Sequence, residues 1–192
     1  MADRITREDI QSWVQSFVWC GEYDEEEVGL LIEDQLGPDD ELDEEWLRRV
    51  IRTEVAAKQK AEETWPEVTD FDRLDRAFAT LKAKGIIALH RAGFTQTDGL
   101  EEVQDDYEDN GGKDSDYAGH CFYTEQDQKR ALNGGGLCIG FGHLSGNDAK
   151  GVEVGQMLRA ALEQEGFSVE WDGTIGRRLF VTEFRWQRRS PR

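Results

Sequence analysis

Polar and apolar positions alternate at helical spacing over the first part of the chain. Apolar side chains recur once per helical turn, and each run follows a residue that can cap a helix N-terminus. The spacing predicts four amphipathic helices, which begin near Thr6, Asp24, Asp43 and Asp70. Short turns between amphipathic helices are typical of a small bundle, so we expect an acidic helical region over residues 1–84.

The pattern changes after Gly85, where short apolar runs appear. The runs with the length of strands are 86–90, 120–123, 137–141, 167–171 and 178–182. Helical spacing fills the first three gaps, and a glycine-containing turn joins the last two runs as a hairpin. The expected order is β-α-β-α-β-α-β-β, in an α/β domain over residues 85–192 with a C-terminal β-hairpin. We assign the chain to the α+β class, with α/β-like crossovers that make neighbouring strands parallel and a final antiparallel edge.

The run Leu137–Phe141 is the one around which the predicted sheet is arranged. Three glycines precede it, and Gly140 lies within it. Glycine inside a strand marks a bulge or the close approach of another group to the backbone. We expect this strand to be buried at or near the centre of the sheet, with Ile139 in the core.

The net charge of −18 restricts the partners that the protein can bind. Residues 1–84 carry 23 acidic and 11 basic side chains, and residues 85–192 carry 18 and 12. Such a field repels nucleic acid and anionic membranes, and it speeds encounter with basic proteins. We therefore expect a basic protein partner, no nucleic acid and no membrane. The alternative, in which the acidity only keeps the protein soluble, stays open.

The cysteines and the N-terminal residues bear on the compartment. Cys20, Cys121 and Cys138 are widely spaced and form no C-x-x-C pair, which favours reduced thiols. The first twenty residues mix charged and aromatic side chains without the pattern of a secretory signal. No apolar run approaches the ~20 residues of a membrane helix. We expect a cytoplasmic protein.

The second half of the chain resembles a bacterial domain family of unknown function. The matching segments are Gly119–Tyr123, Gln126-Asp127, Gly134–Leu137, Phe141-Gly142, Val169–Gly173, Arg177-Arg178, Trp186 and Arg188-Arg189. Members of that family commonly have a cysteine cluster where this chain has Phe94–Gly99, so thiol or metal chemistry there does not carry over. The resemblance implies a family membership and no established activity.

The three histidines are candidates for a site in the sheet domain. If the strands run parallel, His90 and His143 lie at the carboxyl edge, where open α/β sheets bind ligands, and His120 lies at the opposite edge. A small enzyme or ligand-binding domain would then use His90, Asp98, Tyr123 and His143 around a crevice. A two-histidine metal site completed by Asp98 or Asp148 is an alternative, but ordinary strand-end histidines are favoured. No glycine motif has the spacing of a nucleotide loop, which disfavours nucleotide binding. We expect no metal and no cofactor.

Two groups of residues are candidates for partner binding. Acidic residues flank the second predicted helix, and from them we select Asp39, Asp40, Glu41 and Glu44. In the hairpin, Trp171, Asp172 and Arg177 could form a recognition surface, although a turn ordered by its own aspartate is favoured. These features favour a non-enzymatic acidic protein-binding module, such as an immunity- or antitoxin-like inhibitor of a basic partner, over the small α/β enzyme.

Overall fold

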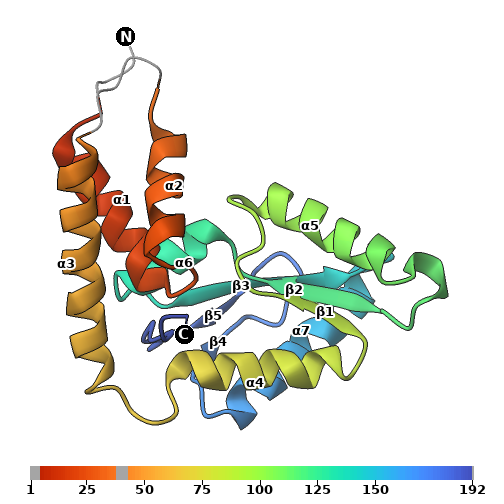
Figure 1. Ribbon diagram of the computed structural model, residues 1–192. Coiled ribbons are helices and arrows are strands. Elements are labelled where there is room, and N and C mark those ends of the chain that lie inside the picture. The colour runs from red at the N-terminus through yellow and green to blue at the C-terminus, as the bar shows by residue number, and fades with distance from the viewer. Residues whose placement is uncertain (1–4, 38–42, 192) are drawn as a thin grey trace. The chain divides into compact units, whose positions relative to one another are not determined.

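The computed structural model describes residues 5–37 and 43–191, which form two compact units (Figure 1). The first, the helical unit, holds the chain up to Thr69 together with the segment after Trp186. The second, the sheet unit, runs from Asp70 to Trp186. None of the helices in the described ranges combines the length and apolarity needed to cross a bilayer.

The helical unit contains three of the predicted helices, α1 (Arg7–Cys20), α2 (Glu25–Gln35) and α3 (Glu44–Glu62). Thr6 caps α1, Asp24 caps α2 and Asp43 caps α3, each by accepting a hydrogen bond from a backbone N–H of the first turn. The predicted helix starts are therefore confirmed. The buried apolar side chains of the three helices form one core: Ile10, Val14, Val18, Val28, Ile32, Leu47 and Ile51.

The C-terminal segment completes the helical unit. The guanidinium of Arg188 pairs with Glu22, beside the turn at Gly21 that ends α1. The backbone N–H and the hydroxyl of Ser190 each donate to Glu62 Oε1 over 2.9 Å. The unit is thus built from two segments that are distant in the sequence, an arrangement that the predicted division into residues 1–84 and 85–192 does not contain.

The sheet unit contains all the remaining elements. They are α4 (Asp70–Lys82), β1 (Ile86–Leu89), α5 (Gln96–Asp109), the 3₁₀ turn η1 (Gly112–Asp114), β2 (Gly119–Phe122), α6 (Glu125–Leu132), β3 (Leu137–His143), α7 (Asp148–Gln164), β4 (Val169–Glu170) and β5 (Leu179–Val181). The strands form one sheet in the order β1-β2-β3-β5-β4. The predicted α+β class, the order of elements, the central position of β3 and the terminal hairpin are confirmed.

The strand directions differ from the prediction. β1 and β2 are parallel, as expected, but β2 and β3 are antiparallel, and β5 also pairs antiparallel with β3. The connection between β2 and β3, residues 123–136, contains the eight-residue α6 and returns the chain beside β2 in the opposite direction. The expectation of three parallel crossovers is wrong for this pair, and His143 therefore lies at the opposite edge from His90.

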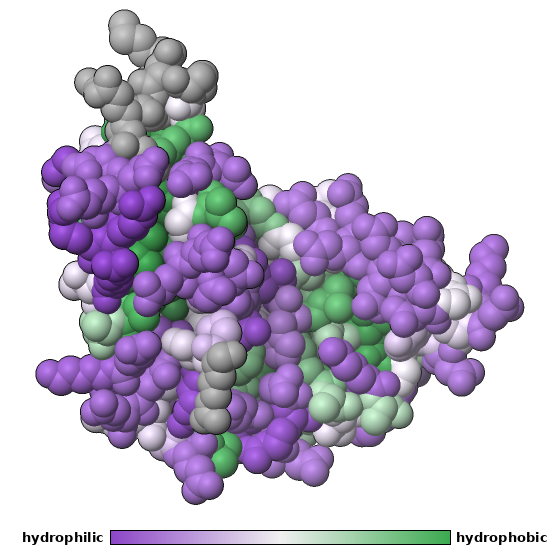
Figure 2. All heavy atoms as spheres, viewed as in Figure 1, coloured by the Kyte–Doolittle hydropathy of each residue, from purple (hydrophilic) through white to green (hydrophobic). Residues whose placement is uncertain are grey.

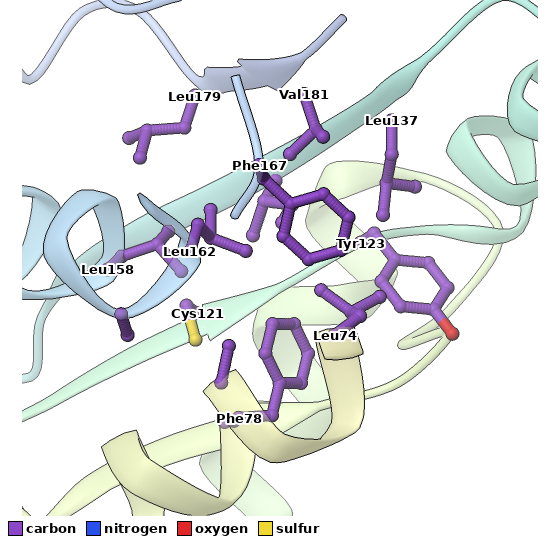
Figure 3. Close-up of a cluster of buried hydrophobic side chains, with 14 of the residues drawn as sticks. Leu74, Phe78, Cys121, Tyr123, Leu137, Leu158, Leu162, Phe167, Leu179 and Val181 are labelled. Atoms are coloured by element: carbon purple, nitrogen blue, oxygen red, sulfur yellow. The ribbon is translucent and has the colours of Figure 1, made fainter. Parts of the chain in front are cut away.

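The two faces of the sheet are covered by different helices (Figure 1). α4 and α7 pack together on one face, and α5 covers β1 on the other. Figure 3 shows the main core, which lies between the sheet and the two helices α4 and α7. There, Leu74 and Phe78 of α4 meet Cys121 of β2 and Leu158 of α7. α4, which the sequence placed with the helical region, thus supplies core side chains to the sheet unit.

Candidate functional site

A groove between α2 and α3 is one of the concave surfaces of the helical unit. It encloses about 330 Å³. Apolar side chains are visible in Figure 2 between the hydrophilic surfaces of these two helices. The lining residues are Glu25, Glu26, Gly29, Leu30 and Glu33 of α2, and Glu44, Leu47, Arg48, Ile51 and Arg52 of α3.

The groove combines an apolar floor with an exposed apolar ridge. Leu47 and Ile51 are buried at its floor, where they belong to the core of the unit. Leu30, in contrast, is 57% exposed although it is a large aliphatic side chain. Next to it, Gly29 has no heavy atom within 4 Å of the position that a Cβ would take, so the helix surface is open there. An exposed leucine beside an open helix surface provides apolar area that a partner could cover.

Acidic side chains dominate the rim of the groove. Four glutamates line it against two arginines, all of them exposed. Arg48 is paired with Glu44 at 2.8 Å, one turn earlier on α3, which neutralises part of the positive charge. The rim glutamates on α2 keep their negative charge turned to the groove. The groove therefore has a surplus of negative charge around an apolar strip.

Partner binding by the acidic residues that were selected from the sequence stays a prediction. Glu44 lines it, whereas Asp39, Asp40 and Glu41 lie outside the described residues. Sequence reasoning missed Leu30 and Glu33 as surface residues. The sequence did contain an indication that Leu30 is exposed. Leu30 does not fit the apolar face of α2 and lies on the same side of the helix as the acidic positions.

His90 and Tyr123 are brought together at the carboxyl edge of β1 and β2. The Nδ1 atom of His90 lies 3.2 Å from the hydroxyl oxygen of Tyr123, and its Nε2 atom lies 3.2 Å from Asp75 Oδ1. An ionised carboxylate can only accept, so in the neutral imidazole Nε2 would carry the proton that is donated to Asp75, and Nδ1 would accept from the Tyr123 hydroxyl. The imidazole also stacks on Phe78, with ring centroids 4.6 Å apart. The arrangement satisfies the polar groups of a buried tyrosine and a half-buried histidine.

Asp98 and His143 do not join this pair. Asp98 is the third residue of α5, and its carboxylate accepts a hydrogen bond from the backbone N–H of Thr95, while Thr95 Oγ1 accepts one from the backbone N–H of Asp98. These bonds hold the pKa of Asp98 below its usual range. His143 lies at the far end of β3, beside the start of β2. The predicted crevice around His90, Asp98, Tyr123 and His143 is therefore divided between two edges of the sheet.

The same register overturns the prediction that His120 is remote from His143. His120 pairs with Gly142, the neighbour of His143, and the charge of His143 contributes to lowering the pKa of His120. Within residues 5–37 and 43–191, no three His, Cys, Asp or Glu side chains are placed to hold a metal ion together. Asp148, weighed as a further ligand, is the first residue of α7.

The hairpin residues form a compact local structure. Asp172 accepts hydrogen bonds from the backbone N–H and the hydroxyl of Thr174, and its carboxylate lies 3.6 Å from Arg177. The bonds from Thr174, followed by the charge of Arg177, hold the pKa of Asp172 below its usual range. The indole N–H of Trp171 donates to the carbonyl oxygens of Thr174 and Arg177. The turn ordered by its own aspartate is confirmed, and partner binding by these residues stays a prediction.

Comparison with known proteins gives a family and no activity. A family model described as a domain of unknown function, DUF6891, matches residues 3–190. The match includes the helical unit as well as the second half of the chain, where the sequence resemblance was found. No match was found among the curated proteins or among the solved structures.

Proposed function

The chain belongs to the DUF6891 family, a domain of unknown function, and from its geometry we propose that it is a non-enzymatic protein-binding module. Its helical unit binds a basic amphipathic helix of a protein partner in the groove between α2 and α3. The observation that carries the proposal is the exposed Leu30 beside the buried Leu47 and Ile51, within a rim of glutamates.

Charge and shape together favour this class of partner. An amphipathic helix binds by placing apolar anchors in a groove, and its flanking charges select the orientation. The helical unit carries 20 acidic and 10 basic side chains, so its field attracts a basic partner over several ångströms before contact. The same field disfavours nucleic acid and anionic membranes. Covering a basic functional surface would inhibit the partner, in the manner of an immunity protein or an antitoxin.

The alternative, a small α/β enzyme, has weaker support. Its proposed crevice needed His143 close to His90, whereas the antiparallel β2–β3 pair separates them. Asp98 is engaged in the capping of α5, and the Tyr123 side chain is fully buried. The remaining His90–Tyr123 pair is accounted for by the packing of the core.

A synthetic helical peptide with leucine anchors and flanking lysines is the probe for this groove. Binding of the fluorescently labelled peptide to the full-length protein would be followed by anisotropy over a range of salt concentrations. We expect Glu33→Lys and Leu30→Ala each to weaken binding about tenfold, which corresponds to about 1.4 kcal/mol. The association rate should fall as salt screens charges beyond the Debye length of ~10 Å at 0.1 M.

Asp34→Lys is the matched control. Asp34 is exposed and adjacent to Glu33 on α2 but does not line the groove, and the charge change is identical. We expect this variant to bind within about twofold of the unmodified protein after allowing for its net charge. Equal losses for Glu33→Lys and Asp34→Lys would show that only net charge matters, as would an unchanged affinity for Leu30→Ala. Either result would mean that the overall negative field attracts the peptide without a specific site in the groove, and it would contradict the proposal.

We also propose that the protein acts in the cytoplasm. Among the described residues, Cys20, Cys121 and Cys138 form no disulfide, and the first two are buried. Burial raises the pKa of the Cys121 thiol to about 12, so this cysteine is held as an unreactive thiol. Fractionation of host cells with detection of the protein tests the proposal, and recovery from an oxidising compartment would contradict it.

A further inference from the structure

Three polar side chains from separate elements converge on one face of β3. Cys138 and Gly140 are two residues apart on this strand and therefore face the same side. Arg130, from α6, places its Nη1 atom 3.4 Å from Cys138 Sγ. Above Gly140, a Cβ atom would lie 2.8 Å from Gln96 Oε1 and 3.8 Å from Arg178 Cδ. α5, α6 and the segment before β5 thus meet over the central strand.

Glycine at position 140 is explained by this convergence. The backbone of Gly140 does not adopt the left-handed conformation that would by itself favour glycine. A side chain there would instead collide with the amide of Gln96. The missing side chain lets the polar groups approach the strand closely, which is a recurrent reason for glycine within a strand.

Hydrogen-bond donors exceed acceptors at this place. Arg178 donates to the buried Asp127 over 2.7 Å, which uses one of its guanidinium N–H groups. Arg130 forms no ion pair with any residue that the structure describes. The Nε2 atom of Gln96 is buried and has no hydrogen-bond partner among the same residues. Of these side chains only Arg178 is paired with a carboxylate, that of Asp127, so among the described residues Arg130 and the amide N–H of Gln96 have no negatively charged acceptor.

Both arginines lie close enough to the Cys138 thiol to affect its pKa. Burial raises the pKa of this half-buried thiol, while the charges of Arg178 and Arg130 act in the opposite direction. Two positive charges and the one negative charge of Asp127 therefore act on this thiol, in a protein whose net charge is −18.

We propose that Arg130, Arg178 and Gln96 form a binding site for a small oxyanion, a carboxylate or phosphate group, over Cys138 and Gly140. Guanidinium groups bind both kinds of oxyanion through paired N–H donors. The amide N–H of Gln96 would add a hydrogen-bond donor from a third side chain. The site lies within the sheet unit, so it is independent of the groove between α2 and α3.

Alkylation of Cys138 is the readout, because an anion held above its thiol would hinder the reagent. The full-length protein is treated with iodoacetamide at constant ionic strength, with inorganic phosphate, succinate or chloride, and labelling of each cysteine is followed by peptide mass spectrometry. We expect phosphate or succinate to slow the labelling of Cys138 saturably, with no effect of chloride. Protection by phosphate alone would assign the ligand to phosphates, and protection by succinate alone would assign it to carboxylates.

Variants distinguish a specific oxyanion site from general electrostatic attraction of anions to the protein. Arg130 is exposed and has no carboxylate partner in the described chain, so Arg130→Gln should leave the fold intact. It should raise the anion concentration needed for half-protection about tenfold, since it removes a charge-assisted hydrogen bond.

Gly140→Ala should also abolish protection, because its methyl group enters the site. Arg159→Gln, which removes an exposed arginine on α7, is the matched control and should change nothing. Equal effects of Arg130→Gln and Arg159→Gln, or no protection by either oxyanion, would overturn the proposal.

Discussion

His120 lies directly opposite Gly142 in the antiparallel pairing of β2 with β3. Its imidazole fills the space above this glycine, because a Cβ atom at position 142 would lie 2.8 Å from His120 Cε1. The ring also stacks on Phe122, with centroids 5.9 Å apart. The pairing explains both a buried histidine and a glycine inside the central strand.

The contact predicts the effect of adding one methyl group. Gly142→Ala should lower the free energy of unfolding by about 1–3 kcal/mol, since the buried ring must move to accept it. Urea denaturation followed by circular dichroism measures the change. Gly176→Ala is the control, because the nearest atom to its Cβ position is 4.0 Å away, and we expect a change within about 0.5 kcal/mol. Equal stabilities for the two variants would contradict the close packing of His120 on Gly142.

His120 should also make the stability depend on pH. Burial, followed by the charge of His143, lowers the pKa of His120 to about 4 from its ordinary value of 6.5. Between about pH 4 and pH 6.5, His120 of the unfolded chain therefore binds a proton that His120 of the folded chain does not bind. The contribution of His120 is complete above pH 6.5 and is lost as the pH falls towards 4, by up to about 1.4 kcal/mol per pH unit.

Comparison with a variant isolates this contribution from the many carboxylates. His120→Phe keeps a ring against Phe122 but cannot be protonated. Its free energy of unfolding should fall less than that of the unmodified protein between about pH 7 and about pH 5. His143→Gln should retain most of the pH dependence, because burial is the larger cause of the shift. The same slope for His120→Phe and the unmodified protein would show that His120 is not buried as a neutral ring.

The sequence predicted the elements well because their signals are local. Capping residues such as Thr6 and Asp24, and the apolar run of β3, act within a few residues of where they occur. Strand direction is different, since it depends on how far the connecting segment travels. The 14-residue connection that contains α6 is long enough for a parallel crossover, so its length does not indicate that β3 returns antiparallel beside β2.

The candidate sites were less accessible to sequence reasoning for the same physical reason. Leu30 and Glu33 form a rim only when α3 lies beside α2. Gln96, Arg130 and Arg178 come from three elements, and only the folded sheet unit brings them to β3. His90 and Tyr123 lie close together because both follow the parallel strands β1 and β2 directly. Residues that meet through non-local packing leave no periodic pattern in the chain.

Ile139 tests the central position of β3 in the core. Its side chain is fully buried, and the residue pairs with Leu179 of β5. Ile139→Asp should lower the free energy of unfolding by several kcal/mol, about 4 or more, because an unpaired carboxylate would enter the core. Leu100→Asp changes a residue of α5 that is 48% exposed, and it should cost less than about 1 kcal/mol. Soluble yield and urea denaturation measure both, and an Ile139→Asp protein as stable as Leu100→Asp would contradict the topology.

The pairing of Arg188 with Glu22 predicts that the C-terminal segment stabilises the helical unit. Both side chains are largely buried, with 30% and 13% of their surfaces exposed. Arg188→Gln should destabilise this unit by about 1–3 kcal/mol, because it removes a charged donor from the largely buried Glu22 carboxylate. Hydrogen exchange measured by mass spectrometry should show faster exchange at the end of α1, where Gly21 lies against the Arg188 carbonyl.

A double variant distinguishes loss of this ion pair from a general loss of packing. Combining Glu22→Gln with Arg188→Gln removes both charges, so the pair of amides should cost less than the sum of the single changes. Arg177→Gln removes the same charge from a side chain that is 77% exposed, and it should leave exchange in α1 unchanged. Additive effects of the two single changes would show that the segment is held by Ser190 and its bonds to Glu62 instead. In that case Ser190→Ala, and not Arg188→Gln, should accelerate exchange, and it should do so near the end of α3.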